Sequence, residues 1–72
     1  MTYKRSKPLN PDLSSKVIDA LGGTACVAGF CSVTSAAVSY WRKYGIPPAQ
    51  IRFLREKFKR NPVMKNDEIR SF

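Results

Sequence analysis

Apolar residues recur at helical spacing along most of this chain, with turn and capping residues between the apolar stretches. Asn10 and Pro11 predict the start of a first helix, because Asn caps a helix N-terminus and Pro fits the first helical position. Gly22 and Gly23 predict its end, since Gly readily adopts the left-handed conformation found there. The apolar face between these signals consists of Leu13, Val17, Ile18 and Leu21.

Two more short helices, joined by a tight turn, are predicted within Thr24–Lys43. Thr24 is the expected N-cap of the first of them. Val33 ends its apolar run, and Thr34 is placed to cap the next helix with its hydroxyl oxygen. The inward positions of the first helix are small or apolar: Val27, Ala28 and Cys31.

The second helix of this pair has two unlike faces. Ala37, Val38 and Trp41 share one side and are expected to be buried. The helix is therefore expected to pack on a core with that side and to face outward with the other. The outward side carries Ser35, Ala36, Ser39, Tyr40 and Lys43.

The residues after the outward helix also favour helix. Pro47 or Pro48 is expected to open a helix over Ala49–Lys59. Asn61 and the following Pro62 are expected to stop it. Its buried side is predicted to hold Ile51, Leu54 and Phe58.

The last ten residues form a short segment of mixed polar and apolar composition. One helical turn is predicted over Asp67–Arg70, with Ile69 and Phe72 resting on the core. No alternating strand pair and no hairpin signal is present. The chain is therefore predicted to be all-α, a small domain of four to five helices. The expected organisation is a flexible basic arm at 1–9, the helical domain at 10–60, and a C-terminal extension at 61–72 that is either a short helical turn or disordered.

The central pair of helices resembles a known DNA-binding unit. Ala28 is small enough for two helices to approach closely, and Val33 is placed to plug the turn. Val38 and Trp41 are placed to dock the outer helix. With the Gly-Ile-Pro-Pro that follows at 45–48, these residues resemble the helix-turn-helix of phage Cro-type repressors, most of all the small Cro and YdaS-like regulators.

The resemblance covers about Val17 to Phe58 and departs from the family at one position. Ser32 stands where the turn usually has Gly. A left-handed conformation costs a non-Gly residue about 1–2 kcal/mol, which leaves open an adjusted turn. Some Cro proteins use β-strands after the third helix, and here Pro47 and Pro48 favour the all-helical form.

The resemblance implies a phage-encoded transcription regulator that binds double-stranded operator DNA with helix 34–43 in the major groove. It carries base contact onto Thr34, Ser35, Ala36, Ser39 and Tyr40. It carries phosphate contact onto Thr24, Arg42 and Lys43. The helix front lacks the Arg, Asn and Gln that read bases bidentately. Specificity would then need hydroxyls, water, DNA shape or a homodimer on a palindrome.

The charge balance also indicates an anionic partner. The chain has 13 Lys and Arg against 5 Asp and Glu, a formal net charge of +8. A membrane partner is disfavoured, because no apolar run approaches the ~20 residues that span a bilayer. No apolar signal segment follows the basic start, so a cytoplasmic location in a bacterium or an infected host cell is expected.

Part of this charge lies in the predicted arm, where Lys4, Arg5 and Lys7 accompany Tyr3. The arm is either a solvated tail or a segment that contacts phosphates or a partner protein. The basic run in helix 49–59 leaves the same two interpretations open, because a face that serves solubility alone usually mixes charge signs.

A second hypothesis has the same scaffold bind host RNA polymerase directly, as an inhibitor or antiterminator. The weak base-reading front and the basic arm motivate it. An antitoxin or a nucleic-acid chaperone has no dedicated sequence feature. Phe53, Val63 and Phe72 either form a dimer patch or complete the core of a single copy.

Catalytic, metal and cofactor chemistry are not predicted. The chain has no His, and its few acids are scattered, so a zinc site lacks ligands. Cys26 and Cys31 are expected to be small buried residues on different sides of the predicted helix and turn, which disfavours a disulfide. Neither a Gly-rich phosphate loop nor a nucleophile with its base is present, so an enzyme is not expected.

Overall fold

The computed structural model describes residues 7–72, and every regular element in that range is a helix. This confirms the predicted all-α fold class. The elements are α1 (Pro11–Ala20), α2 (Thr24–Cys31), α3 (Ser35–Tyr44), α4 (Pro48–Lys57), the 3-10 helix η1 (Pro62–Lys65) and α5 (Asp67–Arg70).

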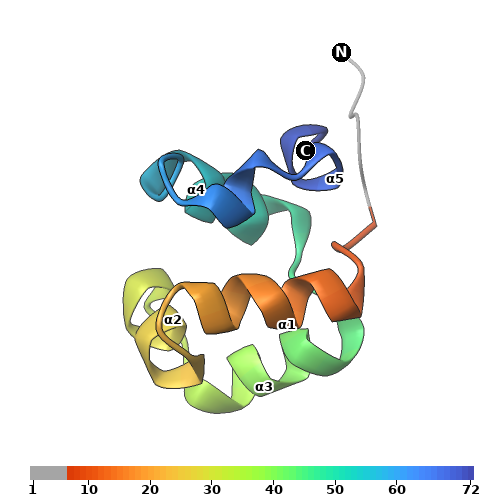
Figure 1. Ribbon diagram of the computed structural model, residues 1–72. Helices are drawn as coiled ribbons and strands as arrows, with labels where there is room; N and C mark the ends of the chain where they lie inside the picture. The colour runs from red at the N-terminus through yellow and green to blue at the C-terminus, as the bar shows by residue number, and fades with distance from the viewer. Residues whose placement is uncertain (1–6) are drawn as a thin grey trace.

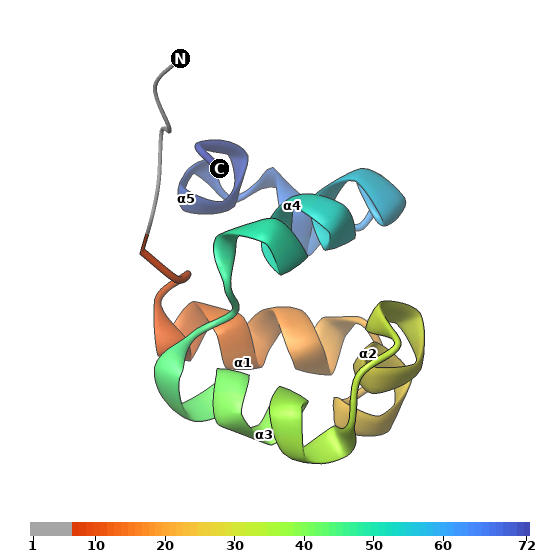
Figure 2. The same ribbon diagram turned by 180° about the vertical axis from the view of Figure 1, so that it is seen from behind.

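Helix α1 lies between two layers of the molecule (Figure 1). Helices α2 and α3 are on one side of it, and α4 and α5 are on the other, as the view from behind also shows (Figure 2). Helix α1 packs against α2 and α3 in the first layer and against η1 in the second, while α5 contacts both η1 and α4. The chain thus passes from one layer to the other through the extended segment between α3 and α4.

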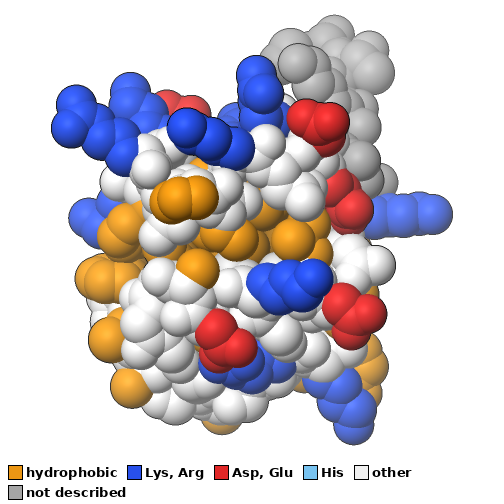
Figure 3. Space-filling model, viewed as in Figure 1, with side chains coloured by type: hydrophobic (Ala, Val, Ile, Leu, Met, Phe, Trp, Pro, Cys, Tyr) orange, Lys and Arg blue, Asp and Glu red, His pale blue; other side chains and the backbone are white. Residues whose placement is uncertain are grey.

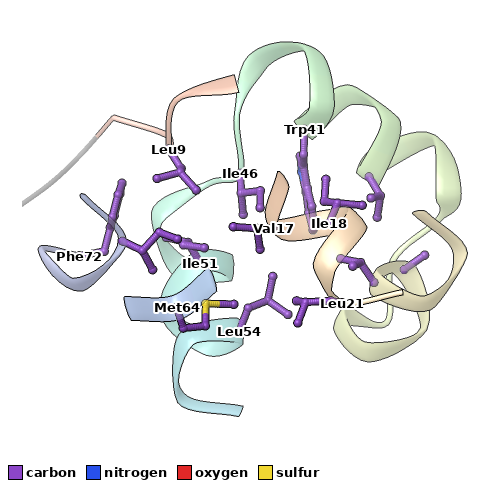
Figure 4. Packing of buried hydrophobic residues seen from close by; sticks show 14 residues of the cluster. Leu9, Val17, Ile18, Leu21, Trp41, Ile46, Ile51, Leu54, Met64 and Phe72 are labelled. Atoms are coloured by element: carbon purple, nitrogen blue, oxygen red, sulfur yellow. The ribbon is translucent and has the colours of Figure 1, made fainter. Parts of the chain in front are cut away.

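One apolar cluster joins the two layers, and its side chains come from every helix (Figure 4). Burying one such side chain is worth about 1.5–3 kcal/mol, so this cluster is the main source of stability in so small a chain. Its buried members are Leu9, Val17, Ile18, Leu21, Val27, Ala28, Val38, Trp41, Ile46, Ile51, Leu54, Met64, Ile69 and Phe72.

Asparagine side chains start three of the helical segments. The Asn10 side-chain oxygen accepts hydrogen bonds from the backbone N–H groups of Asp12 and Leu13, at 2.8 and 3.3 Å, which confirms the predicted start of α1. Asn61 caps η1 and Asn66 caps α5 in the same way. Each cap satisfies N–H groups that have no partner within their own helix.

The sequence predicts that Leu9 belongs to a flexible arm. This prediction is wrong, because the structure places Leu9 fully inside the core. Its N–H donates to the Ile46 carbonyl at 2.9 Å. The buried Ser14 hydroxyl completes this junction, donating to the Leu9 carbonyl at 3.3 Å and accepting the Ile46 N–H at 3.0 Å. Sequence periodicity could not detect this contact, because Leu9 stands alone ahead of α1 and its partner is far along the chain.

The C-terminal segment, for which the sequence leaves a helical turn and disorder open, forms η1 and α5. Met64, Ile69 and Phe72 are buried in the common core, which confirms the predicted turn with Ile69 and Phe72 resting on it. Val63 packs against the same core, whereas Phe53 on α4 stays 45% exposed. Of the three candidate dimer residues, Phe53 is therefore the one whose side chain is largely exposed.

Two further sequence predictions need correction. Helix α4 ends at Lys57 and not at Lys59, because Phe58 already has φ −118° and ψ 33° and leaves the helical conformation. Cys26, expected to be buried, is exposed on the first turn of α2, while Cys31 is half-buried and partly desolvated, which raises the pKa of its thiol.

Gly45 permits the close approach between the start of the helical domain and the segment after α3. Its φ is +105°, and a Cβ atom there would collide with the Leu9 carbonyl oxygen. Only a residue without a side chain fits this position.

We expect Gly45→Ala to destabilise the protein by about 2–5 kcal/mol, the combined cost of a positive φ and of overpacking. Denaturant unfolding would measure the loss. Gly29→Ala is the matched control, because Gly29 lies within helix α2 and a Cβ there meets nothing within 4 Å. That control should gain up to about 1 kcal/mol from helix propensity. Equal stability of the two variants would contradict the Gly45 contact.

Candidate nucleic-acid interface

The turn between α2 and α3 takes a left-handed conformation without glycine. Ser32 has φ 56° and ψ 43° and is the one non-glycine residue with positive φ within residues 7–72. The Val33 N–H then donates to the Ala28 carbonyl at 3.0 Å, which closes the end of α2. The predicted turn is therefore present at the predicted place, and Ser32 adopts the strained conformation itself.

Thr34 caps α3 as predicted. Its side-chain oxygen accepts the Ala37 N–H at 3.2 Å, and the threonine remains exposed. Val38 and Trp41 point into the core, which confirms the expected buried side, while Ala37 is half-buried. The core therefore holds α3 along its inner side and fixes which residues face outward.

The outward face of α3 is the row predicted from the sequence. All of its members are exposed: Ser35, Ala36, Ser39, Tyr40 and Lys43. Tyr44 extends this row, being 50% exposed, and its ring lies 4.4 Å from that of Tyr40 between centroids. The Lys43 ammonium lies 5.5 Å from the centre of the Tyr44 ring. Sequence reasoning misses Tyr44, although its i+4 spacing from Tyr40 is a signal for this pair.

Arg42 and Thr24, both assigned to phosphate contact from the resemblance, contact each other. The Arg42 Nε donates to the Thr24 Oγ1 at 2.9 Å, and its Nη2 donates to the Asp19 carboxylate at 2.6 Å. One guanidinium thus links α1, α2 and α3. The prediction that Thr24 is an N-cap is wrong, because Gly23 holds the cap position and Thr24 is the first helical residue.

Of the arm residues assigned to partner or phosphate contact, Lys7 is described and exposed. Tyr3, Lys4 and Arg5 lie outside the described residues.

The positive charge lies mainly in the layer opposite α3. On the outward face of α3, Lys43 is the cation that has no carboxylate partner within the described residues. Lys and Arg side chains gather instead over α4 and α5 (Figure 3). The basic residues of this layer are Arg52, Arg55, Lys57, Lys59, Arg60, Lys65 and Arg70.

Residues 7–72 contain neither a cluster of metal-ligating side chains nor a helix that could span a membrane. No group of three or more His, Cys, Asp or Glu side chains there is placed to hold a metal ion. No helix in this range combines the length and the apolar character that crossing a membrane requires.

Comparisons with family models, with curated proteins and with solved structures found no match to this chain.

Replacing Ser32 tests the turn directly. Gly relieves about 1–2 kcal/mol of left-handed strain and costs about 0.5–1 kcal/mol in chain entropy. We therefore expect Ser32→Gly to raise the free energy of unfolding by about 0.5–1 kcal/mol, measured from urea midpoints. Ser35→Gly, on the first turn of α3, should bring no gain, because Gly is a poor helix former. A Ser32→Gly protein no more stable than the parent would contradict a strained turn.

Proposed function

We propose that this protein is a helix-turn-helix transcription regulator that binds operator DNA through α3. The supporting observation is the exposed row on α3, on a helix that Val38 and Trp41 anchor from within. A rigid helix that stands outward after a tight turn fits the major groove of B-DNA.

The chemistry of this row favours readout by small groups. Thr34, Ser35 and Ser39 offer hydroxyls, which pair with several bases, and Ala36 offers a methyl group for a thymine methyl. Tyr40 adds a phenol that can donate or accept a hydrogen bond. Lys43, one turn further along, is placed for a phosphate.

Arg42 has a different role in this proposal from the one implied by the family resemblance. Its two hydrogen bonds to Thr24 and Asp19 hold α3 against α1 and α2. Arg42 and Thr24 therefore orient the recognition helix.

Selection from a pool of random-sequence duplexes tests the proposal whatever the operator sequence is. We expect the full chain to enrich a common motif. Tyr40→Ala should weaken binding to that motif about two- to tenfold, because a single hydrogen bond contributes about 0.5–1.5 kcal/mol. Gel shifts at fixed salt would measure the loss.

Phe53→Ala is the matched control, since Phe53 is an exposed aromatic residue on the opposite layer. It should bind the motif as the parent does. Failure to enrich any motif, or equal losses in the two variants, would contradict DNA reading by α3.

A second candidate function is direct binding to bacterial RNA polymerase. The observation that favours it is the exposed Tyr40–Tyr44 pair on a face where Lys43 is the one unpaired cation among the described residues. Exposed aromatic side chains are enriched at protein–protein interfaces, whereas DNA-binding faces are strongly basic.

Immobilised full chain and purified, nuclease-treated polymerase separate the two candidates. If polymerase is the partner, it should be retained. Deletion of residues 1–7 removes the basic arm that the second hypothesis also uses, so it should abolish retention while only weakening binding to DNA. The deletion leaves the buried Leu9 in place, so the core is kept. Polymerase that passes the column unretained excludes this candidate.

A further inference from the structure

A basic hollow lies between α4 and the C-terminal helical segments, in the layer away from α3. Its volume is about 440 Å³, and it is lined by Arg55, Glu56, Lys59, Met64, Lys65 and Arg70. Four of these six side chains are cationic and one is anionic, so the hollow carries a formal charge of +3. The candidate function on α3 uses none of them.

Arg55 is a fixed member of this group. Its Nη1 donates to the backbone carbonyls of Ile69 and Arg70, at 3.3 and 3.2 Å. These bonds hold the guanidinium over the end of α5, where helix carbonyls lack partners within the helix. The hollow therefore has one positive charge whose position is set by the fold.

The other three cations are exposed and available. Lys59, Lys65 and Arg70 form no ion pair with any carboxylate of residues 7–72. The one acidic side chain of the lining, Glu56, pairs with Arg55 at 3.7 Å and is itself 72% exposed. Glu56 therefore offsets about one of the four positive charges, and the hollow keeps an excess of cations.

The composition of the hollow favours phosphates over an acidic protein. Protein interfaces are enriched in exposed aromatic residues and depleted of Lys. Here two of the cations are lysines, and the one apolar side chain of the lining, Met64, is 3% exposed. Several point charges around a hollow that no aromatic side chain lines match the phosphate groups of a nucleic-acid backbone.

We propose that the hollow bounded by Arg55, Lys59, Lys65 and Arg70 binds the phosphodiester backbone of a nucleic acid without reading its sequence. Arg55 provides the fixed charge, and the other three cations settle on neighbouring phosphates. The site acts separately from α3, which lies on the other side of α1.

The test measures binding of the full chain to a random-sequence DNA duplex by fluorescence anisotropy, between about 0.05 and 0.2 M salt. Lys59→Ala and Lys65→Ala, made separately, should each lower the slope of log K against log salt by about 0.9 in magnitude. Each should weaken affinity about fivefold near 0.15 M salt, which is the effect of one lost phosphate contact. The same strand used alone should show a smaller drop, about 0.7, if single strands are the ligand.

Lys16→Ala is the matched control, because it removes one exposed lysine on α1 that is not part of the lining of the hollow. It should leave the slope unchanged. A loss at Lys59 and Lys65 with either duplex or single strand, absent at Lys16, supports the proposal and identifies the ligand. Equal slopes in all three variants overturn it, since binding would then follow net charge alone.

Tyr40→Ala separates this site from the function proposed for α3. Binding to random-sequence DNA through the hollow should survive that substitution, because Tyr40 is not part of its lining. If α3 fails to select a motif, the proposed function fails, but the salt slopes of the lysine variants still test the hollow independently.

Discussion

Burial of the apolar side of α1 is the constraint on which the rest of the structure depends. Val17, Ile18 and Leu21 are all buried, because a helical layer covers α1 on each side. Apolar side chains from both layers pack with them in one cluster, and a chain of 72 residues has room for only a small core. The fold therefore needs its C-terminal segment, whose Met64 and Phe72 close the second side of the core.

This core also determines how α3 is presented. Val38 and Trp41 hold the helix from inside, and Arg42 ties it to α1 and α2 through Asp19 and Thr24. If α3 is the recognition helix proposed above, a helix held in this way would lose little conformational freedom on binding, which would lower the entropic cost of association. The same bonds commit Arg42 to structure, so the outward face of α3 is nearly free of charge.

The proposed sites divide two tasks between the two layers. The face of α3 offers hydroxyls and aromatic rings for discrimination, and the hollow around Lys59, Lys65 and Arg70 offers charge. Charge attracts a polyanion over a distance set by the salt concentration, whereas hydroxyls act only in contact. A regulator of this design would gather nucleic acid with one layer and select it with the other.

The sequence by itself determined the five α-helices apart from the end of α4, the caps at Asn10 and Thr34, and the outward row on α3. These features depend on residues within a turn or two of each other, and helical periodicity records them directly. The tertiary structure alone decided that Leu9 joins the core and that Thr24 pairs with Arg42. It also placed most cations in the layer opposite α3. The sequence could not reveal these features, because contacts between distant segments leave no periodic pattern in the chain.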